Sequence, residues 1–203
     1  MHFAPRPVYC IVPHHITFCS DIAMKREVAL REAKWLVEPG CVVLVTSGTL
    51  ERANIMTFSW QTPVHSGEPC LLQLVINPTR YTYELIQQNR ELVINVPGAE
   101  LVREVHMIGT TSGRRVEKFR ESGLTPVASE MVAPPLVDEC AANLECRVVQ
   151  IIDIEHHHLL ICQAVRAVAE VAYFDGRWNP ERFHTLHYLG GNRYGVMERM
   201  IEV

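Results

Sequence analysis

Two hydroxyls and one guanidinium lie close together in the first half of the chain. Thr79, Arg80 and Thr82 fall between an apolar run that predicts a buried strand, residues 70–76, and a helix predicted over 82–88. The first backbone N–H groups of a helix have no partner within it, and the helix dipole is positive at that end. The segment therefore predicts an anion site, and its side chains suit a single terminal phosphate.

A simpler interpretation of this segment stays open. Thr79 can cap the helix while Arg80 lies on the surface, and composition alone favours that arrangement. A triphosphate is disfavoured, because such ligands usually need a Gly-rich loop and a metal.

Polar side chains also gather in a strand predicted over residues 54–60. Its alternation places on one face Asn54, Met56, Phe58 and Trp60, and on the other Ile55, Thr57 and Ser59. Hydroxyls beside a large flat ring suit a ligand with a polar tail and a planar ring, although each residue taken singly is ordinary in a strand.

A third cluster begins at Ser112 and Gly113. These two residues can offer a hydroxyl and an unhindered N–H group at the start of a helix predicted over 114–121, and Lys118 adds a cation one turn further on. A solvated helix that follows a Ser-Gly turn explains the same pattern.

Histidines raise the question of a metal site. His156, His157 and His158 are adjacent in a predicted turn, and His184 and His187 are three apart. Adjacent histidines on an extended turn point in different directions, and no HExxH spacing accompanies them, so we expect no metal site. The sequence also lacks a GxSxG elbow, a Walker loop and a catalytic-cysteine signature, and it nominates no catalytic acid, base or nucleophile.

Composition indicates a globular protein. The 203 residues are 48% hydrophobic and 21% charged, and the net charge of −4 comes from interspersed signs, which gives no basis for binding nucleic acid or an anionic membrane. No apolar run approaches the roughly 20 residues of a membrane span. The seven cysteines have no CxxC spacing, which favours buried free thiols in a reducing, cytoplasmic setting.

The remaining pattern predicts mainly strands. Further strands are expected over 41–47 (closed by Gly48), 91–96, 144–152 and 159–171, and helices over 22–36 and 97–108. Short connections imply antiparallel pairing and hence a mainly β protein, a β-barrel with inserted helices. We expect one domain over 24–203, preceded by an N-terminal extension over 1–23 whose order the sequence does not define.

In this order, the segments resemble the flavin reductase-like family of FMN-binding split-barrel proteins, and within it the flavoredoxin branch. The resemblance covers about residues 24–195. Its motifs are residues 42–46, 54–60, 78–86, 92–97, 112–114 with Lys118 and Phe119, 144–147 and 187–191. The chain departs from relatives at Gly109, where a cysteine is common, and at Glu155-His-His157, where Gly-Asp-His is frequent.

The resemblance implies a homodimer of split barrels that holds FMN non-covalently near the subunit interface. It assigns the flavin contacts to Asn54, Met56, Thr57, Ser59, Trp60, Arg80, Tyr81, Thr82, Ser112 and Lys118, with Arg80, Tyr81 and Thr82 at the phosphate and ribityl chain. It further implies an oxidoreductase that passes hydride or electrons through FMN, from NAD(P)H or a redox partner protein. Two alternatives stay open: a non-enzymatic electron carrier between proteins, and a split barrel that binds another planar ligand.

Overall fold

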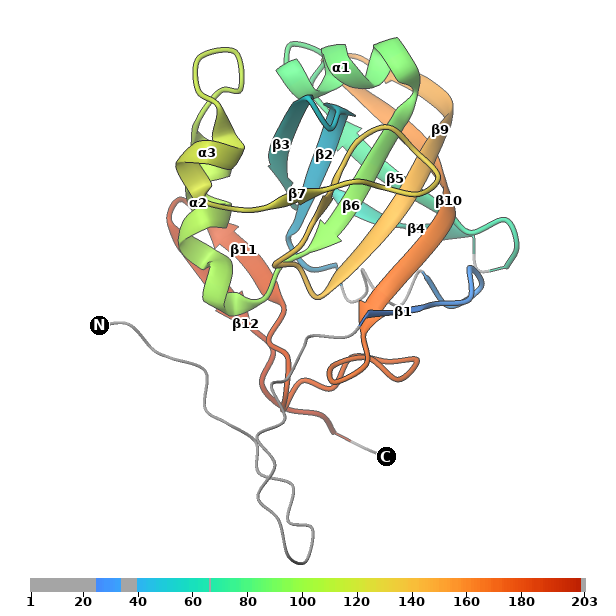
Figure 1. Cartoon of the computed structure of the whole chain (residues 1–203), viewed down its shortest axis with the longest axis vertical. Helices are drawn as coiled ribbons and strands as arrows, with labels where there is room; N and C mark the ends of the chain where they lie inside the picture. The colour runs from blue at the N-terminus through green and yellow to red at the C-terminus, as the bar shows by residue number, and fades with distance from the viewer. Residues whose placement is uncertain (1–24, 34–39, 66, 202–203) are drawn as a thin grey trace, which may run out of the picture.

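A computed structural model describes residues 25–33, 40–65 and 67–201. Within these residues, eight strands form one antiparallel sheet in the order β3-β2-β6-β9-β10-β5-β4, with β1 paired to β10. The strands are β1 (Lys25–Glu27), β2 (Val43–Thr49), β3 (Arg52–Phe58), β4 (Gln61–His65), β5 (Leu71–Ile76), β6 (Glu91–Val96), β9 (Ala142–Ile154) and β10 (His157–Glu170). The sheet curls around a core, as Figure 1 shows. The predicted mainly β fold is confirmed.

Short helices and hairpins decorate this barrel (Figure 1). Helix α1 (Tyr81–Asn89) crosses one end between β5 and β6, and α2 (Val102–Thr110) packs beside β3 after a 3-10 turn (Ala99–Leu101). Helix α3 (Lys118–Ser122) follows, and two strand pairs complete the structure: β7 (Pro126–Val127) with β8 (Leu136–Val137), and β11 (Leu186–Gly190) with β12 (Arg193–Val196). None of the described helices combines the length and apolar character needed to cross a membrane.

Strand β3 separates two apolar clusters, and its alternation explains how. Phe58 packs with the large cluster inside the barrel and Met56 lies against that cluster, whereas Ile55 belongs to a second cluster under α2. In that second cluster, Val105 and Ile108 of α2 are fully buried, as the predicted helical face requires. The side chains of β3 therefore join the barrel to the helical layer, and the site described below lies where the two meet.

Several sequence predictions were wrong. The helix predicted over 22–36 is not present in residues 25–33, where β1 instead pairs with the end of β10 and the remaining positions lie outside the described residues. This long-range pairing overrides the local helical period. Gly48 does not close the strand predicted over 41–47, because β2 runs from Val43 to Thr49. The short strands β4, β7, β8, β11 and β12 were not anticipated.

The helix predicted over 114–121 is also shorter in the structure, where α3 begins only at Lys118. Residues 113–115 form a turn, and the N–H groups of Arg115 and Val116 donate to the carbonyl oxygen of Ser112. The helix begins at Lys118 because the carboxylate of Glu117 accepts hydrogen bonds from the N–H groups of Phe119 and Arg120.

The cysteines that the structure describes are all buried. They are Cys41, Cys70, Cys140, Cys146 and Cys162. Burial raises the pKa of the Cys162 thiol to about 12, so this group stays protonated and unreactive at neutral pH. Cys10 and Cys19, like the whole extension 1–23, lie outside the described residues.

Candidate functional site

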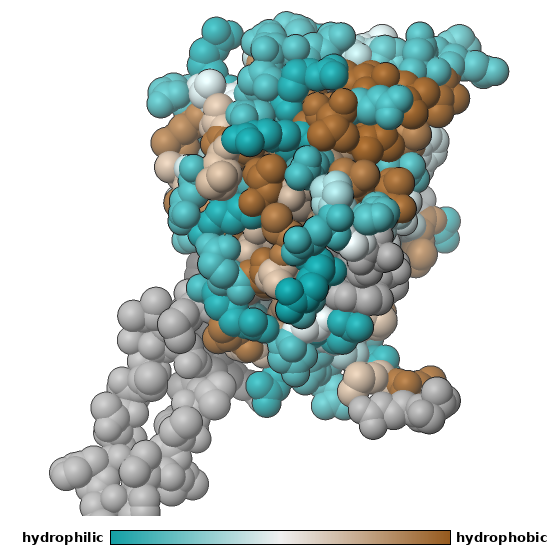
Figure 2. Space-filling model, turned by 90° about the vertical axis from the view of Figure 1, so that its right-hand side faces the viewer, coloured by the Kyte–Doolittle hydropathy of each residue, from teal (hydrophilic) through white to brown (hydrophobic). Residues whose placement is uncertain are grey.

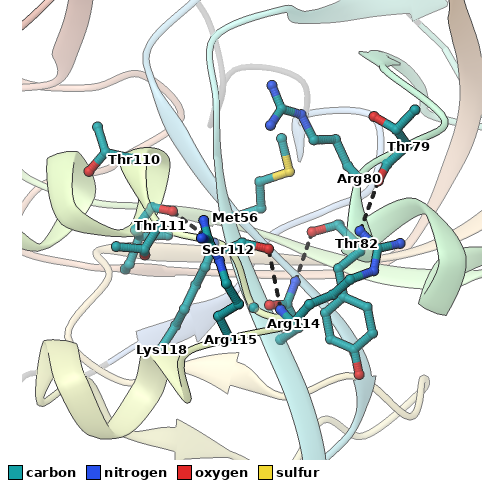
Figure 3. Close-up of a pocket in the computed structure, with 15 residues that line it drawn as sticks. Met56, Thr79, Arg80, Thr82, Thr110, Thr111, Ser112, Arg114, Arg115 and Lys118 are labelled. Carbon is teal, nitrogen blue, oxygen red and sulfur yellow. Dashed lines mark hydrogen bonds between the residues drawn. The ribbon is translucent and has the colours of Figure 1, made fainter.

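A cavity of about 190 Å³ opens where β3, the start of α1 and the loop from α2 to α3 meet (Figure 3). We call it the phosphate cavity, after the anion that the sequence predicts at the start of α1. It brings together seven of the ten residues predicted from sequence: Asn54, Met56, Arg80, Tyr81, Thr82, Ser112 and Lys118. Three segments that are far apart in sequence thus supply one site.

The floor of the phosphate cavity is fixed by polar contacts between β3 and its neighbours. The amide of buried Asn54 donates to the hydroxyl oxygen of Thr82 over 2.8 Å, which ties the strand to the first turn of α1. Gly113 lies directly against Asn54: a Cβ at this position would come within 1.9 Å of the Asn54 Oδ1. Only glycine therefore lets the loop approach the strand this closely.

Lys118 places a cation inside the cavity wall. Its side chain is buried, and within the described chain its only hydrogen bond runs from Nζ to the backbone oxygen of Ile108, over 2.8 Å, near the carbonyl end of α2. Burial, and then the positive charge of Arg80, lower the pKa of this ammonium from 10.5 to about 8. A buried ammonium without a carboxylate partner is an unfavourable arrangement that an anionic ligand would relieve.

Arg80 adds a second positive charge at the start of α1. It occupies the N-cap position without a capping side chain, so the interpretation of Thr79 as the helix cap was wrong. The Thr79 hydroxyl instead donates to Asn77 Oδ1 over 2.7 Å. Within the described residues, the Arg80 guanidinium has no ion-pair or hydrogen-bond partner, and Figure 3 shows it extending beside Met56.

Arg114 closes the cavity, a role that the sequence analysis did not assign. Its guanidinium donates to the backbone carbonyl oxygen of Thr79 over 2.9 Å and forms an ion pair with Glu84 at 2.8 Å. The same guanidinium lies over the Tyr81 ring. These contacts fasten the α2–α3 loop to the start of α1. The sequence did mark Arg114 as part of the Ser-Gly-Arg motif. It could not show which residues Arg114 contacts, because these partners are far away in sequence.

The other three predicted residues lie in an adjoining hollow. Thr57, Ser59 and Trp60 line this space, which shares Met56 and Arg80 with the phosphate cavity. We call it the ring hollow. Ser59 and Trp60 follow the end of β3, so the strand has the predicted length but begins and ends two residues earlier than the predicted 54–60.

His157 also lines the ring hollow, and sequence reasoning gave it no role. Its ring centroid lies 5.5 Å from that of Trp60, which is 61% exposed. The predicted turn between the two long strands is present and contains His156, but placing His157 and His158 in it was wrong, because both belong to β10. Within the described part of the chain, no group of three potential metal ligands comes together.

The chemistry of the two spaces is therefore asymmetric. The phosphate cavity offers a buried ammonium, a guanidinium, hydroxyls and the N-terminus of α1, a donor set that fits a phosphate dianion. The ring hollow offers an exposed indole, a thioether and small hydroxyls, a lining that fits a flat aromatic ring. The two spaces adjoin, so one ligand with a ring and a phosphate fits both.

Comparison with known proteins identifies the family of the chain. A family model described as the flavin reductase like domain matches residues 38–187. The chain belongs to the flavin reductase-like family. An uncharacterized protein of Archaeoglobus fulgidus is 39% identical over 151 residues, which cover 74% of this chain and 84% of that protein. The FMN reductase (NADH) RutF of Yersinia enterocolitica is 28% identical over 145 residues, which cover 68% of this chain and 75% of that protein.

Solved structures show the same fold. An FMN-binding domain of a flavin reductases-like enzyme from Shewanella baltica superposes with a TM-score of 0.81 at 23% identity, covering 89% of this chain and 98% of that one. Flavoredoxin from Methanosarcina acetivorans gives a TM-score of 0.71 at 26% identity, and the match covers 80% of this chain and 87% of that one. The flavin reductase-like split barrel is thus the fold of this chain.

The buried charge of Lys118 predicts an unusual stability effect. Because its folded-state pKa of about 8 lies below 10.5, the charge lowers stability at neutral pH, and this loss fades as pH rises from 8 to 10.5. We expect Lys118→Met to raise the free energy of unfolding of the flavin-free protein by about 1–3 kcal/mol at pH 7, and by less at pH 10. Urea denaturation at the two pH values measures this.

A second lysine provides the control. Burial lowers the pKa of Lys25 as well, but Lys25 Nζ donates to the Asn143 side chain at 2.9 Å and to the Asp138 backbone carbonyl at 3.1 Å. Lys25→Met removes both of these hydrogen bonds and should therefore raise the free energy of unfolding by less than Lys118→Met does. A Lys118→Met protein that is less stable than the parent at pH 7 would show that Lys118 serves the fold.

Proposed function

We propose that this protein binds FMN non-covalently and acts as an FMN-dependent oxidoreductase with NAD(P)H as electron donor. The observation that carries the proposal is that buried Lys118 lines the same cavity as Arg80, whose guanidinium has no partner among the described residues. A hollow that ends at Trp60 adjoins this cavity. Family membership supports a flavin, and the description of the Yersinia relative as FMN reductase (NADH) supports the donor.

Different residues would contact different parts of FMN. Arg80, Tyr81 and Thr82 would hold the phosphate and ribityl chain, and Ser112 and Lys118 would close that end. Asn54, Met56, Thr57, Ser59 and Trp60 would line the rest of the flavin. When bound, FMN supplies the hydride or electron transfer through its ring. The chain's own share is to bind the phosphate and to orient the ring in a partly enclosed hollow.

We also propose a homodimer. Apolar side chains are exposed on the outer face of β9, where Val149, Ile152 and Ile154 are 49%, 37% and 50% exposed. Figure 2 shows apolar atoms gathered on the upper part of this side of the molecule. The neighbouring Trp60 and His157 border the ring hollow, so a second copy seated here would cover it.

The phosphate assignment predicts a specific loss of affinity. Arg80→Ala removes a charge-assisted hydrogen bond to the phosphate and should weaken FMN binding by about 1.5–3 kcal/mol. Isothermal titration calorimetry measures this, with Arg193→Ala, an exposed arginine of β12, as the matched control. Equal FMN dissociation constants for Arg80→Ala and the parent would contradict the assignment.

Turnover tests the enzyme class. With excess free FMN added as the electron acceptor, the protein should oxidise NADH or NADPH in a steady-state absorbance assay, and Arg80→Ala should need more FMN to reach the same rate. Failure to oxidise either nucleotide, together with rapid reduction by a donor protein, would instead identify an electron carrier. A protein that takes up no FMN in titration would overturn both.

Sedimentation equilibrium tests the dimer. The parent should show twice the 23.1 kDa chain mass, and Ile154→Lys should shift it to the monomer because a charge then enters the apolar contact. Val127→Lys, at a similarly exposed apolar residue of β7, serves as the control. A monomeric parent protein would remove the proposal.

A further inference from the structure

A third space opens between α2, the end of β3 and the β11–β12 hairpin, and we call it the tyrosine cavity. Its volume is about 150 Å³, close to that of an engineered apolar cavity that takes up benzene. It shares Thr57 and Ser59 with the ring hollow, and Gly109 and Thr110 with the phosphate cavity. A molecule in the tyrosine cavity would therefore lie next to the proposed flavin. The FMN proposal assigns no ligand to this space.

The walls of the tyrosine cavity come from elements that are far apart in sequence. His106, Gly109 and Thr110 lie at helical spacing on one face of α2, and Tyr188 and Tyr194 are register partners in the β11–β12 hairpin. Figure 1 shows this hairpin beside α2. The Nδ1 atom of His106 lies 3.3 Å from the Tyr194 hydroxyl, and the two rings meet edge to face. This contact holds the aromatic wall against the helix.

Some polar groups of the lining are already used, and others are not. The hydroxyls of Thr57 and Thr110 donate to backbone oxygens of α2, over 2.6 and 2.9 Å. The hydroxyls of Ser59 and Tyr188 have no hydrogen-bond partner within the part of the chain that the structure describes, and neither does Nε2 of His106. These groups are available to a ligand.

The charge of the tyrosine cavity favours a neutral ligand. None of the described residues that line it is a lysine, arginine, aspartate or glutamate, whereas Arg80 and Lys118 line the phosphate cavity. Burial, and then the neighbouring Tyr188, raise the pKa of Tyr194, so its hydroxyl stays protonated and can donate a hydrogen bond. A charged ring would lose its hydration here without gaining a counter-ion.

We propose that the tyrosine cavity binds a one-ring quinone, which serves as an electron acceptor of the protein. A quinone is neutral and flat, and it has a hydrogen-bond-accepting oxygen at each end of its ring. The available hydroxyl donors likewise come from two walls, Ser59 beyond β3 and the two tyrosines of the hairpin. The volume of the cavity matches a single six-membered ring.

The acceptor role rests on the proposed function, whereas binding of the ring does not. The quinone would take a hydride, which carries two electrons and one proton, from the reduced flavin. A second proton would come from water, and the product would leave as the hydroquinone. The residues of the tyrosine cavity would hold the quinone beside the flavin during this transfer.

Chemical-shift titration of the flavin-free protein with hydroquinone, under nitrogen, tests the binding site. The signals of the Tyr188 ring should move and saturate. Tyr194→Phe keeps the ring but removes a hydroxyl, and it should weaken binding about fivefold. Tyr173→Phe removes a hydroxyl from a residue that lines none of the three spaces, and it should leave binding unchanged. His106→Gln, which keeps an acceptor for the Tyr194 hydroxyl, should bind more tightly than His106→Leu.

Three results would overturn the binding site. They are signals that do not saturate, a Tyr194→Phe protein that binds as tightly as the parent, and benzoate that moves the Tyr188 signals at as low a concentration as hydroquinone. Benzoate has a ring of the same size and a negative charge, so it tests the preference for a neutral ligand. Thermal melts show whether each variant is folded, and the His106 pair keeps the test valid if Tyr194→Phe is unstable.

Stopped-flow mixing of the reduced, FMN-loaded protein with 1,4-benzoquinone, without oxygen, tests the acceptor role. The rate of flavin re-oxidation should saturate with quinone concentration, and Tyr194→Phe should need about fivefold more quinone for half of the maximal rate. A rate that stays proportional to quinone concentration, and equal in both proteins, would overturn this role. A protein that binds hydroquinone but not FMN would overturn the proposed function and the acceptor role while the binding site stands. A protein that binds FMN but not hydroquinone would do the reverse.

Discussion

A buried ammonium that has no counter-ion among the described residues is the constraint on which this site depends. Lys118 lies inside the protein with one backbone carbonyl as its partner, and Arg80 adds charge of the same sign nearby. Burial of a charge disfavours folding unless a binding partner compensates for it. Three segments hold this arrangement in place: β3 through Asn54, α1 through Thr82, and the α2–α3 loop through Gly113. The barrel serves as the rigid support that makes the unfavourable charge tolerable.

The same arrangement explains why the site is divided. Positive charge is concentrated at the helix end of the groove, whereas the strand end beyond β3 carries the exposed ring of Trp60 and the neighbouring His157. In the proposed complex, these two chemically different ends would orient the flavin, with its ring near the surface. The apolar face of β9 borders that end, which connects access to the ring with the proposed association of two chains.

Sequence reasoning recovered the parts of the structure that local patterns determine. Strands β5, β6, β9 and β10 and helix α1 follow from apolar period and flanking turn residues. Strand β1 was mistaken for a helix because only its pairing with β10 makes it extended. In the site, ordered motifs identified residues that now line two adjoining spaces. The closing role of Arg114 could not be read from the sequence, because its partners Thr79 and Glu84 lie 35 and 30 residues away.

Comparing the affinities of FMN and riboflavin tests the central claim most directly, since the two ligands differ only in the phosphate. If Lys118 and Arg80 hold that phosphate, FMN should bind at least about tenfold more tightly than riboflavin at pH 7, and the ratio should fall as pH rises past 8 and Lys118 loses its proton in the flavin-free protein. Equal affinities at pH 7, or a ratio that does not change with pH, would contradict the account.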